Sequence, residues 1–547
     1  MQPFTRSRND RNLKKYSLKN GGQKMKELPI GIQSFKDLRK NPIDYLYIDK
    51  TPYIYEMSTK GKIYFLSRPR RFGKSLLISA IDELFSGNNE LFEGLYIYDK
   101  WDWNKKYPVI RIDFGSGDYS SNEKLKDSLA DFLKNYADKF NVILENSAIP
   151  TRFAELIQKV SLSAGGKVVV LVDEYDKPIL DNVLKPKIQK ENRDTLHDFY
   201  QVLKASDDHL KFIFLTGVSK FVGLSIFSAL NNIFDMTIGD EFAGICGYTQ
   251  QELEYNFSEH IDSAANKLSM GRQELLDNIA MHYDGYSWDG KTRVYNPFSI
   301  LMFFRNQIFD FFWYRTATPT FLMDIIKNKS NINEIIEPQT VGSSFFSISD
   351  VKMISVSSLL FQTGYLTIKD SEIIKGIARY NIGIPNNEVK DALLNNLFKT
   401  YSDYPSDNIE ILRDDMRNQI EERDETGFEK NLKMLFAYIP YTLNLKYEKS
   451  YHALFLITMK LLGFDIDGES LTNLGRIDAV MKLGAYNVIA EFKYSAKKSI
   501  KIMLAEAMKQ IKNKKYYEKY TDRPIIFLAI AFKDNDLKCK FVQFIGK

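Results

Sequence analysis

The sequence contains little cysteine and little histidine. Its 547 residues include two cysteines, Cys246 and Cys539, and five histidines. The two cysteines are far apart and match no metal-binding spacing, which argues against a disulfide framework and favours a reducing compartment. The histidines form no pair at helical spacing, so we do not expect a structural zinc site.

Long apolar runs are also absent. No run reaches the roughly 18 residues that a membrane-spanning helix needs, and the N-terminal residues lack the apolar core of a signal peptide. We therefore expect a cytoplasmic protein without a membrane partner. A hydrophobic content of 44% and a charged content of 27% are ordinary for a globular chain of several domains.

The charge is unevenly distributed along the chain. Residues 1–26 carry a formal charge of +7, residues 430–547 carry +10, and the residues between them carry −12. Because residues 1–26 show no hydrophobic periodicity, we interpret them as a disordered basic tail, with a nucleic-acid-binding arm as the alternative. The basic C-terminal segment suggests that nucleic acid meets this part of the chain first.

A phosphate-binding turn is predicted in the stretch IYFLSRPRRFGKS, residues 63–75. A short apolar run there leads into a basic turn, which leads into the helical pattern SLLISAIDELF. Such a strand-to-helix junction offers backbone N–H groups and a helix dipole to an anion. We expect Lys74 to reach the outer phosphates and Ser75 to ligate Mg²⁺. The candidate nucleotide-binding residues are Arg71, Phe72, Gly73, Lys74, Ser75 and Leu76.

A second nucleotide motif follows in KVVVLVDEY, residues 167–175. Its continuous apolar run is typical of a parallel strand that helices cover on both faces. It ends in Asp173, placed to hold a Mg²⁺ shell, and Glu174, placed to polarise the attacking water. The alternative for the first motif alone is an ordinary basic turn, but the two motifs in this order predict ATP and Mg²⁺ binding.

Further apolar runs complete a five-stranded set. PVIRIDF precedes the second motif, while KFIFL and IFDMTI follow it, with helical patterns between them. This alternation predicts a parallel sheet with right-handed crossovers. Thr216 and Ser219, directly after KFIFL, are candidates for a phosphate-sensing group, and the alternative is a strand-end cap.

The middle of the chain is predicted to be helical, with Thr249 and Glu252 as a capping box. An aromatic cluster of Tyr283, Tyr286, Trp288 and Tyr295 is interpreted mainly as core. Residues around GYLTIK and ARYNIGIP suggest a small winged-helix-like unit, and RDDMRNQIEERDETG is interpreted as a hinge. The division that we expect is a tail (1–26), a P-loop ATPase domain (27–245), a helical and winged-helix-like region (246–387), a charged helical connector (388–429) and a C-terminal domain (430–547).

The C-terminal domain contains a second constellation of charged residues. Asp478 lies in one predicted strand, and Glu491 and Lys493 lie in the next, where residues two apart face the same way. If the strands pair, two carboxylates and a backbone carbonyl form an oxygen site of the kind that Mg²⁺ takes, beside a lysine that activates water. Gln510 on the following helix is a further contact. The alternative is a surface ion pair between Glu491 and Lys493.

These strings resemble a known family. RPRRFGKS, VDEYDKPI, TGVSKF, VYNPFSIL and GYLTIK together are similar to the AAA-ATPase-like family of bacterial proteins. GRIDAV and AEFKY are similar to the PD-(D/E)xK nuclease-superfamily domain that this family carries at its C-terminus. The resemblance implies an α/β fold: a P-loop NTPase with a parallel β-sheet, a helical and winged-helix-like middle region, and a C-terminal α/β nuclease-like domain.

The resemblance also implies roles for single residues. At the nucleotide site, ATP and Mg²⁺ would bind through Gly73, Lys74, Ser75 and Asp173, and Glu174 would be the hydrolytic base. At the nuclease site, a second metal would bind Asp478 and Glu491. Lys493 would be catalytic there, with Glu448 and Gln510 in support. The residue before Asp478 is Ile477 rather than the family's proline, and the arginine finger is unassigned, with Arg68, Arg70 and Arg71 as candidates.

The function expected from both constellations is an ATPase coupled to a Mg²⁺-dependent nuclease that acts on DNA rather than RNA, in defence or mobile-element biology. The alternative is a nucleotide-dependent regulatory switch whose C-terminal domain binds nucleic acid without cutting it. A P-loop kinase is disfavoured, because the pair of Asp173 and Glu174 indicates water as the acceptor. A homo-oligomer is left open, since many P-loop ATPases complete their site with a neighbouring subunit.

Overall fold

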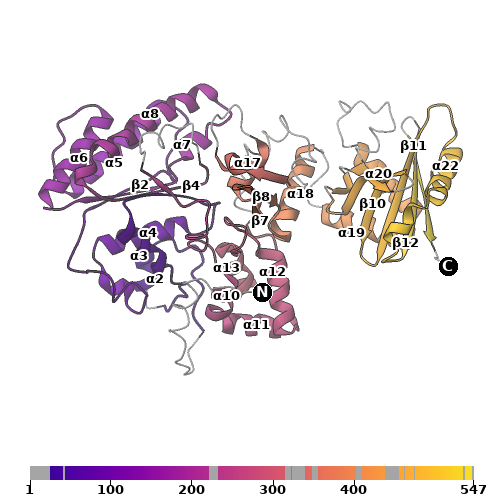
Figure 1. Ribbon diagram of the computed structural model, residues 1–547, viewed down its shortest axis with the longest axis horizontal. Coiled ribbons are helices and arrows are strands. Elements are labelled where there is room, and N and C mark those ends of the chain that lie inside the picture. Colours follow the sequence, from indigo (N-terminus) through magenta and orange to yellow (C-terminus); the bar gives the residue numbers. More distant parts are fainter. Residues whose placement is uncertain are drawn as a thin grey trace.

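The computed structural model describes most of the chain. The described residues are 25–40, 43–220, 232–313, 322, 339–347, 355–401, 409–437, 455–456, 458–460, 462–472, 475–533 and 536–544. They form an N-terminal part built on one sheet, a middle part, and a C-terminal part built on a second sheet at the far end of the long axis (Figure 1). Within these ranges, no helix is both long enough and apolar enough to cross a membrane.

The N-terminal sheet has five parallel strands, which confirms the sequence prediction. The strands are β1 (Ile63–Ser67), β2 (Val109–Asp113), β3 (Val168–Asp173), β4 (Leu210–Gly217) and β5 (Phe234–Asp235). Their order is β2-β3-β4-β1-β5, and every pairing is parallel. The end of β4 therefore lies between the end of β1, where the phosphate-binding turn begins, and the end of β3, where Asp173 lies.

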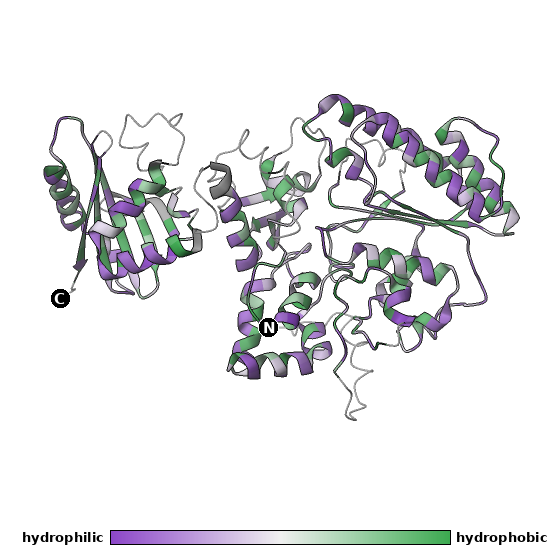
Figure 2. Ribbon diagram, turned by 180° about the vertical axis from the view of Figure 1, so that it is seen from behind, coloured by the Kyte–Doolittle hydropathy of each residue, from purple (hydrophilic) through white to green (hydrophobic). Residues whose placement is uncertain are grey.

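Helices cover both faces of this sheet, α2 to α4 on one and α5 to α8 on the other (Figure 1). They are α2 (Phe35–Lys40), α3 (Thr51–Lys60), α4 (Lys74–Phe85), α5 (Asn122–Lys139), α6 (Ile149–Ser163), α7 (Lys177–Leu180) and α8 (Pro186–Ala205), with short 3₁₀ turns η2 (Asn89–Phe92) and η3 (Asp207–His209). All residues of β3 are buried, as a strand between two helical layers requires. Hydrophilic and hydrophobic residues alternate along α8 (Figure 2), as expected of a helix with one buried face.

The middle part begins with four helices around their own apolar core. They are α10 (Gln250–Asn256), α11 (Ser258–Leu268), α12 (Arg272–Tyr283) and α13 (Pro297–Asn306). The predicted capping box of Thr249 and Glu252 is present at the start of α10. All four aromatic residues of the predicted core cluster are buried.

A helix and an antiparallel hairpin follow, in the order expected of a winged-helix-like unit. The elements are β6 (Gln339–Gly342), η4 (Ser343–Phe346), α17 (Val356–Thr363), β7 (Thr367–Ile374), β8 (Ile377–Gly383) and α18 (Asn387–Tyr401). The sheet order is β6-β8-β7. This unit lies between the helices of the middle part and the C-terminal part (Figure 1).

The C-terminal sheet has five strands in the order β13-β12-β11-β10-β9. They are β9 (Asp465–Thr472), β10 (Gly475–Leu483), β11 (Tyr486–Tyr494), β12 (Ile525–Lys533) and β13 (Asp536–Phe544). Only β11 and β12 pair in parallel, because α22 (Ile500–Asn513) and η7 (Tyr516–Tyr520) connect them. The sequence prediction did not include β13, whose residues alternate between buried and exposed.

The predicted connector differs in the structure. Its charged residues lie on α19 (Ile409–Glu422) and α20 (Glu425–Ala437), and α20 packs on β13. The Glu429 carboxylate accepts hydrogen bonds of 2.8 Å from Cys539 N and from Lys538 Nζ. The run resembles a hinge in the sequence because charged residues predominate in it. Its apolar residues, among them Met416 and Ile420, are nevertheless spaced a helical turn apart and face inward. Residue 429, where the expected connector ends, lies within α20, and the expected domain boundaries stay predictions.

Candidate nucleotide site and candidate metal centre

The phosphate-binding turn joins β1 to α4 as the sequence predicts. Gly73 caps the N-terminus of α4 with a left-handed φ of 92°, a conformation in which glycine is not strained. A Cβ atom built at Gly73 would have no neighbour within 4 Å among the described residues, so there is open space beside this glycine at the start of α4. Ser75 and Leu76 follow in the first turn of α4 and are half-buried. The turn therefore fits a phosphate group, although its nucleotide contacts stay predictions.

Lys74 is buried beneath this turn. Its Nζ donates hydrogen bonds of 2.9 Å to the Arg68 carbonyl and 3.0 Å to the Pro69 carbonyl. Burial lowers the pKa of Lys74, while the carboxylates of Asp173 and Glu174 oppose that shift. The ammonium group consequently lies in the field of both acidic residues of the second motif, and its contact with the outer phosphates stays a prediction.

Asp173 ends β3 and receives a hydrogen bond from the neighbouring strand. Thr216 Oγ1 donates to Asp173 Oδ1 at 2.6 Å, and the Glu174 backbone N donates to the same oxygen at 3.1 Å. The contact forms because β4, which carries Thr216, lies next to β3, which ends in Asp173. Thr216 is therefore bonded to the candidate Mg²⁺ ligand, and its role as a phosphate-sensing group stays a prediction.

Glu174 follows in a strained backbone conformation. Its φ is 52°, in the left-handed region that non-glycine residues rarely adopt and that is common at functional sites. Burial raises the pKa of Glu174, the Lys74 ammonium lowers it, and the Asp173 carboxylate raises it. A carboxylate with reduced solvation beside the phosphate-binding turn is suited to accept a proton from water.

The loop after β2 also contacts Glu174, which the sequence analysis did not recognise. Asp113 pairs with Asp173 across β2 and β3, and its Oδ1 accepts a 2.7 Å hydrogen bond from Gly115 N. A Cβ atom at Gly115 would lie 2.9 Å from that oxygen and 3.6 Å from Glu174 Oε2. The glycines of FGSG directly after a buried strand were the available signal.

The start of the turn packs against the middle part of the chain. The Phe72 ring makes edge contacts with Tyr286 and Trp288, at centroid distances of 4.8 and 5.4 Å. A Cβ atom at Gly364, just after α17, would lie 2.8 Å from the Pro69 ring. Because the Phe72 side chain is buried in this contact, only its backbone is available to a nucleotide.

One of the arginine-finger candidates, Arg68, is buried in contacts within the chain. Arg68 is fully buried, and its guanidinium lies 4.0 Å from the centre of the Trp288 ring. It donates to the carbonyls of Ser67 and Thr237 at 2.8 and 2.9 Å. Arg68 therefore fixes the turn to the segment after β5. Arg71 lies over the Phe298 ring at 4.0 Å, and its role and that of Arg70 stay predictions.

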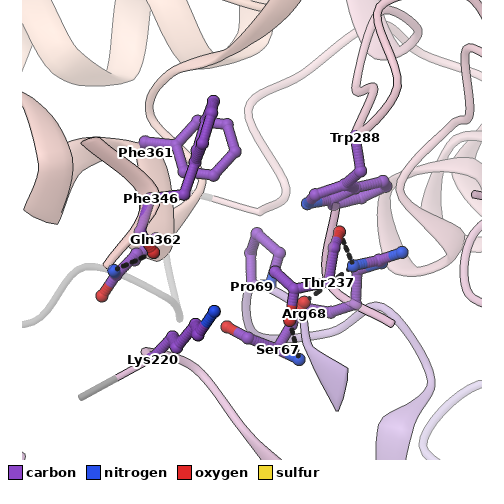
Figure 3. A pocket seen from close by; sticks show the side chains of 9 residues that line it. All are labelled: Ser67, Arg68, Pro69, Lys220, Thr237, Trp288, Phe346, Phe361 and Gln362. Carbon is purple, nitrogen blue, oxygen red and sulfur yellow. Dashed lines mark hydrogen bonds between the residues drawn. The ribbon is translucent and has the colours of Figure 1, made fainter. Parts of the chain in front are cut away.

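A pocket opens beside this arginine, at the carboxyl end of β1 (Figure 3). Figure 3 shows residues from the start of the phosphate-binding turn on one side and Gln362 and two phenylalanines from the winged-helix-like unit on the other. The lining residues are Ser67, Arg68, Pro69, Lys220, Thr237, Trp288, Phe346, Phe361 and Gln362. The middle part thus borders the same strand ends that carry the nucleotide motifs.

In the C-terminal part, the predicted pairing of Asp478 and Glu491 is present. Ala479 pairs with Ala490 in the antiparallel ladder of β10 and β11, which places Asp478 opposite Glu491. Asp478 Oδ2 accepts a 2.9 Å hydrogen bond from the Phe492 backbone N. Lys493 Nζ donates to Glu491 Oε1 at 3.1 Å.

The Glu491 carboxylate has the properties of a cation ligand. The residue is only 1% exposed, and its Oε2 atom is buried with no hydrogen-bond donor among the described residues, while its carboxyl group lies against that of Asp478. Burial raises the pKa of Glu491 to about 8, the Asp478 carboxylate adds to the rise, and Lys493 opposes it. A divalent cation between the two carboxylates would satisfy the Oε2 atom and remove their repulsion. The residues therefore fit a metal ion of the Mg²⁺ type.

The structure describes one of the two residues, Gln510 and Glu448, that the resemblance places in support of the metal site. Gln510 is half-buried on α22, the helix that packs over β11 and β12, and its contact with the metal site stays a prediction. Glu448 lies outside the described residues. Among the residues that the structure describes, no group of three or more His, Cys, Asp or Glu side chains forms a metal site, so the centre rests on two carboxylates.

The fold and both sites define a P-loop ATPase-like protein with a nuclease-like C-terminal domain, and comparison with known families agrees. Residues 29–227 match the family described as "Predicted AAA-ATPase", and residues 446–541 match the PD-(D/E)XK nuclease superfamily. Both matches confirm the resemblance inferred from the motifs.

A relative matches nearly the whole chain. A protein of Azotobacter chroococcum mcd 1, described as "Uncharacterized protein in vnfD 5'region", is 37% identical over 517 residues, which cover 93% of this chain and 96% of the relative. The chain belongs to the family of AAA-ATPase-like proteins that carry a C-terminal PD-(D/E)XK nuclease-superfamily domain.

Proposed function

We propose that this protein hydrolyses ATP in its N-terminal part and cleaves phosphodiester bonds of DNA in its C-terminal part, with Mg²⁺ at both sites. The observation that carries the nuclease proposal is the buried Glu491 carboxylate beside Asp478, with one oxygen that receives no donor from the part of the chain that the structure describes and Lys493 bonded to the other. The setting that we propose is defence or mobile-element biology.

In the ATPase half, the chain's own groups hold the phosphates and the attacking water. The N–H groups at the start of α4 and the Lys74 ammonium bind the phosphate oxygens. Ser75 and Asp173 would hold a Mg²⁺ ion, which would supply charge neutralisation at the outer phosphates. Glu174 accepts the proton of the attacking water, helped by the burial that raises its pKa.

In the nuclease half, Asp478 and Glu491 would hold a divalent cation, which would supply Lewis-acid activation of the phosphodiester and of water. Asp478 is held in place by the Phe492 N–H. The Lys493 ammonium lies within 3.1 Å of Glu491 Oε1, so it is placed to orient the water or to stabilise charge on the phosphate.

A basic surface next to this site supports a nucleic-acid substrate. α22 packs on the strands that carry Glu491 and Lys493, and its Lys501, Lys509 and Lys512 are exposed. Such lysines bind phosphate backbones without reading the sequence. Salt should therefore weaken binding strongly.

The test uses the purified full chain with linear, circular and single-stranded DNA and with RNA, in Mg²⁺ or Mn²⁺, with and without ATP. We expect DNA cleavage that is lost in Glu491→Ala and in Lys493→Ala. The matched control is Glu422→Ala, an exposed glutamate on α19, which should cleave like the wild type. Cleavage that persists in both site variants would contradict the nuclease proposal, and ATP hydrolysis without any cleavage would favour a regulatory switch.

A further inference from the structure

The carboxylate of Asp176, which is buried and lies outside the two nucleotide motifs, accepts hydrogen bonds from a segment that also contacts the start of the phosphate-binding turn. Asp176 lies three residues after Asp173 and is 1% exposed. Its Oδ2 atom accepts hydrogen bonds from Ser219 Oγ at 2.6 Å, from Ser219 N at 2.7 Å and from Val218 N at 3.1 Å. Its Oδ1 atom also accepts from Val218 N, at 3.2 Å. All of these hydrogen bonds come from Val218 and Ser219, in the segment 217–219 that begins at the last residue of β4.

The opposite side of this segment contacts the start of the phosphate-binding turn. Arg68 N donates to the Gly217 carbonyl at 3.2 Å. Ser67 Oγ donates to the Val218 carbonyl at 2.5 Å. The segment 217–219 is therefore bonded on one side to the turn that would hold the phosphates and on the other side to Asp176.

The packing leaves little freedom for this segment to move. A Cβ atom at Gly217 would lie 2.6 Å from Asp176 Oδ1 and 2.6 Å from the Tyr175 ring, so no larger residue fits. Tyr175 N donates to the Thr216 carbonyl, and Tyr175 Oη donates to the Ser219 carbonyl, both at 2.9 Å. Thr216, directly before the segment, donates a hydrogen bond to Asp173. The position of Thr216 thus depends on the residues that follow it.

We propose that Asp176 is a positioning residue for ATP hydrolysis, which holds the segment 217–219 so that Thr216 stays on Asp173 and the phosphate-binding turn stays in register with both. The inference rests on the proposed ATPase function. Asp176 acts through Thr216 and Asp173 on the Mg²⁺ ion and does not itself touch the nucleotide.

Asparagine at position 176 is the sharpest test, because it keeps the shape and changes one acceptor. Both Asp176 oxygens accept hydrogen bonds from N–H groups, so the amide NH₂ of an asparagine must face another donor in either orientation. The full chain carrying Asp176→Asn should bind ATP within about threefold of the wild type, while its kcat falls about 10- to 100-fold, as misplacement of reacting groups predicts.

The Mg²⁺ concentration that gives half-maximal ATPase activity is the readout that distinguishes positioning from plain stability. We expect it to rise several-fold in Asp176→Asn and to stay unchanged in Asp198→Asn, an exposed aspartate on α8 of the same domain. An unchanged Mg²⁺ requirement with a lower melting temperature would overturn the positioning role. If Asp176→Asn does not fold, Ser219→Ala, which removes only the hydroxyl donor, should shift the Mg²⁺ requirement in the same direction.

The outcomes separate this inference from the function on which it rests. A wild-type protein that hydrolyses no ATP would refute the proposed function, and the inference with it. A wild type that hydrolyses ATP, together with an Asp176→Asn variant that matches Asp198→Asn in kcat and Mg²⁺ requirement, would overturn the inference alone.

Discussion

Thr216 Oγ1 lies 2.6 Å from Asp173 Oδ1 and donates a hydrogen bond to it across two neighbouring strands. Both residues are buried at the carboxyl edge of the N-terminal sheet. The bond fixes the orientation of the carboxylate that we propose as a Mg²⁺ ligand. The bond also depends on the strand order, because β4 lies next to β3 and so brings Thr216 to this position.

Replacing Thr216 by valine should therefore impair hydrolysis more than binding. Valine keeps the shape of threonine but leaves the buried Asp173 oxygen without its hydroxyl donor. We expect kcat for ATP to fall about tenfold or more, with the dissociation constant for ATP within about threefold of the wild type. Thr216→Ser, which keeps the hydroxyl, is the control. Equal kcat values for the valine variant and the wild type would contradict a role for this bond.

Phe72 should contribute strongly to the stability of the contact between the phosphate-binding turn and the middle part. Its buried ring packs against Tyr286 and Trp288, so Phe72→Ala leaves a cavity. We expect a loss of about 3 kcal/mol in the free energy of unfolding, measured as a lower melting temperature. Phe234→Ala, at a residue that is 48% exposed, should lose less than about 1 kcal/mol. Equal losses in both variants would contradict the buried contact.

Glu388 should make stability depend on pH. Its carboxylate is fully buried, accepting from Ser299 Oγ and Trp313 N at 2.7 Å each. Burial raises its pKa from 4.5 to about 7. The folded state therefore binds more protons than the unfolded state between these values, so this contribution is complete below about pH 4.5 and is lost as pH rises to about 7.

The variant Glu388→Gln removes this titration. The glutamine amide oxygen can accept a hydrogen bond from Trp313 N. The glutamine NH₂ group can donate to the Ser299 hydroxyl, which then acts as the acceptor instead of the donor. The melting temperature of Glu388→Gln minus that of the wild type should therefore be larger at pH 8 than at pH 5.5. The wild-type loss over this range is at most about 3 kcal/mol. A difference between variant and wild type that is the same at both pH values would contradict the buried, neutral carboxyl.

Mg²⁺ should stabilise the C-terminal part through Glu491. The wild type should melt at a higher temperature in Mg²⁺ than in EDTA, by an amount corresponding to about 2.7 kcal/mol at 100 times the dissociation constant. Glu491→Gln loses the negative ligand, so with nucleotide absent its melting temperature should rise much less in Mg²⁺ than that of the wild type. In EDTA it should be at least as stable as the wild type, because a neutral amide is less costly to bury than a carboxylate. A Mg²⁺ effect of equal size in Glu491→Gln would contradict a metal site at this residue.

Much of the fold follows from local patterns in the sequence. The run VVVLVD is apolar at every position because helices cover both faces of the sheet, so β3 and its neighbours could be predicted. The pairing of Asp478 with Glu491 was also predictable, since two adjacent strand patterns with a short turn favour a hairpin. In both cases the information lies within a few residues of the feature.

Long-range contacts were harder to predict. Arg68 belongs to a basic turn that suggests solvent exposure, yet the distant Trp288 covers it. Glu429 belongs to a charged run, yet its carboxylate bonds Cys539, which is 110 residues away in the sequence. The bonds from Val218 and Ser219 to Asp176 likewise depend on strand order, which no local pattern encodes. Burial by a distant element was the missing information each time.

The most direct test of the two-site account is the rate of cleavage of linear DNA by the full chain in Mg²⁺ and ATP, measured for the wild type and for Glu491→Ala beside Glu422→Ala. The account predicts cleavage by the wild type and by Glu422→Ala, none by Glu491→Ala, and equal ATP hydrolysis by all three. Cleavage at the wild-type rate by Glu491→Ala would contradict it.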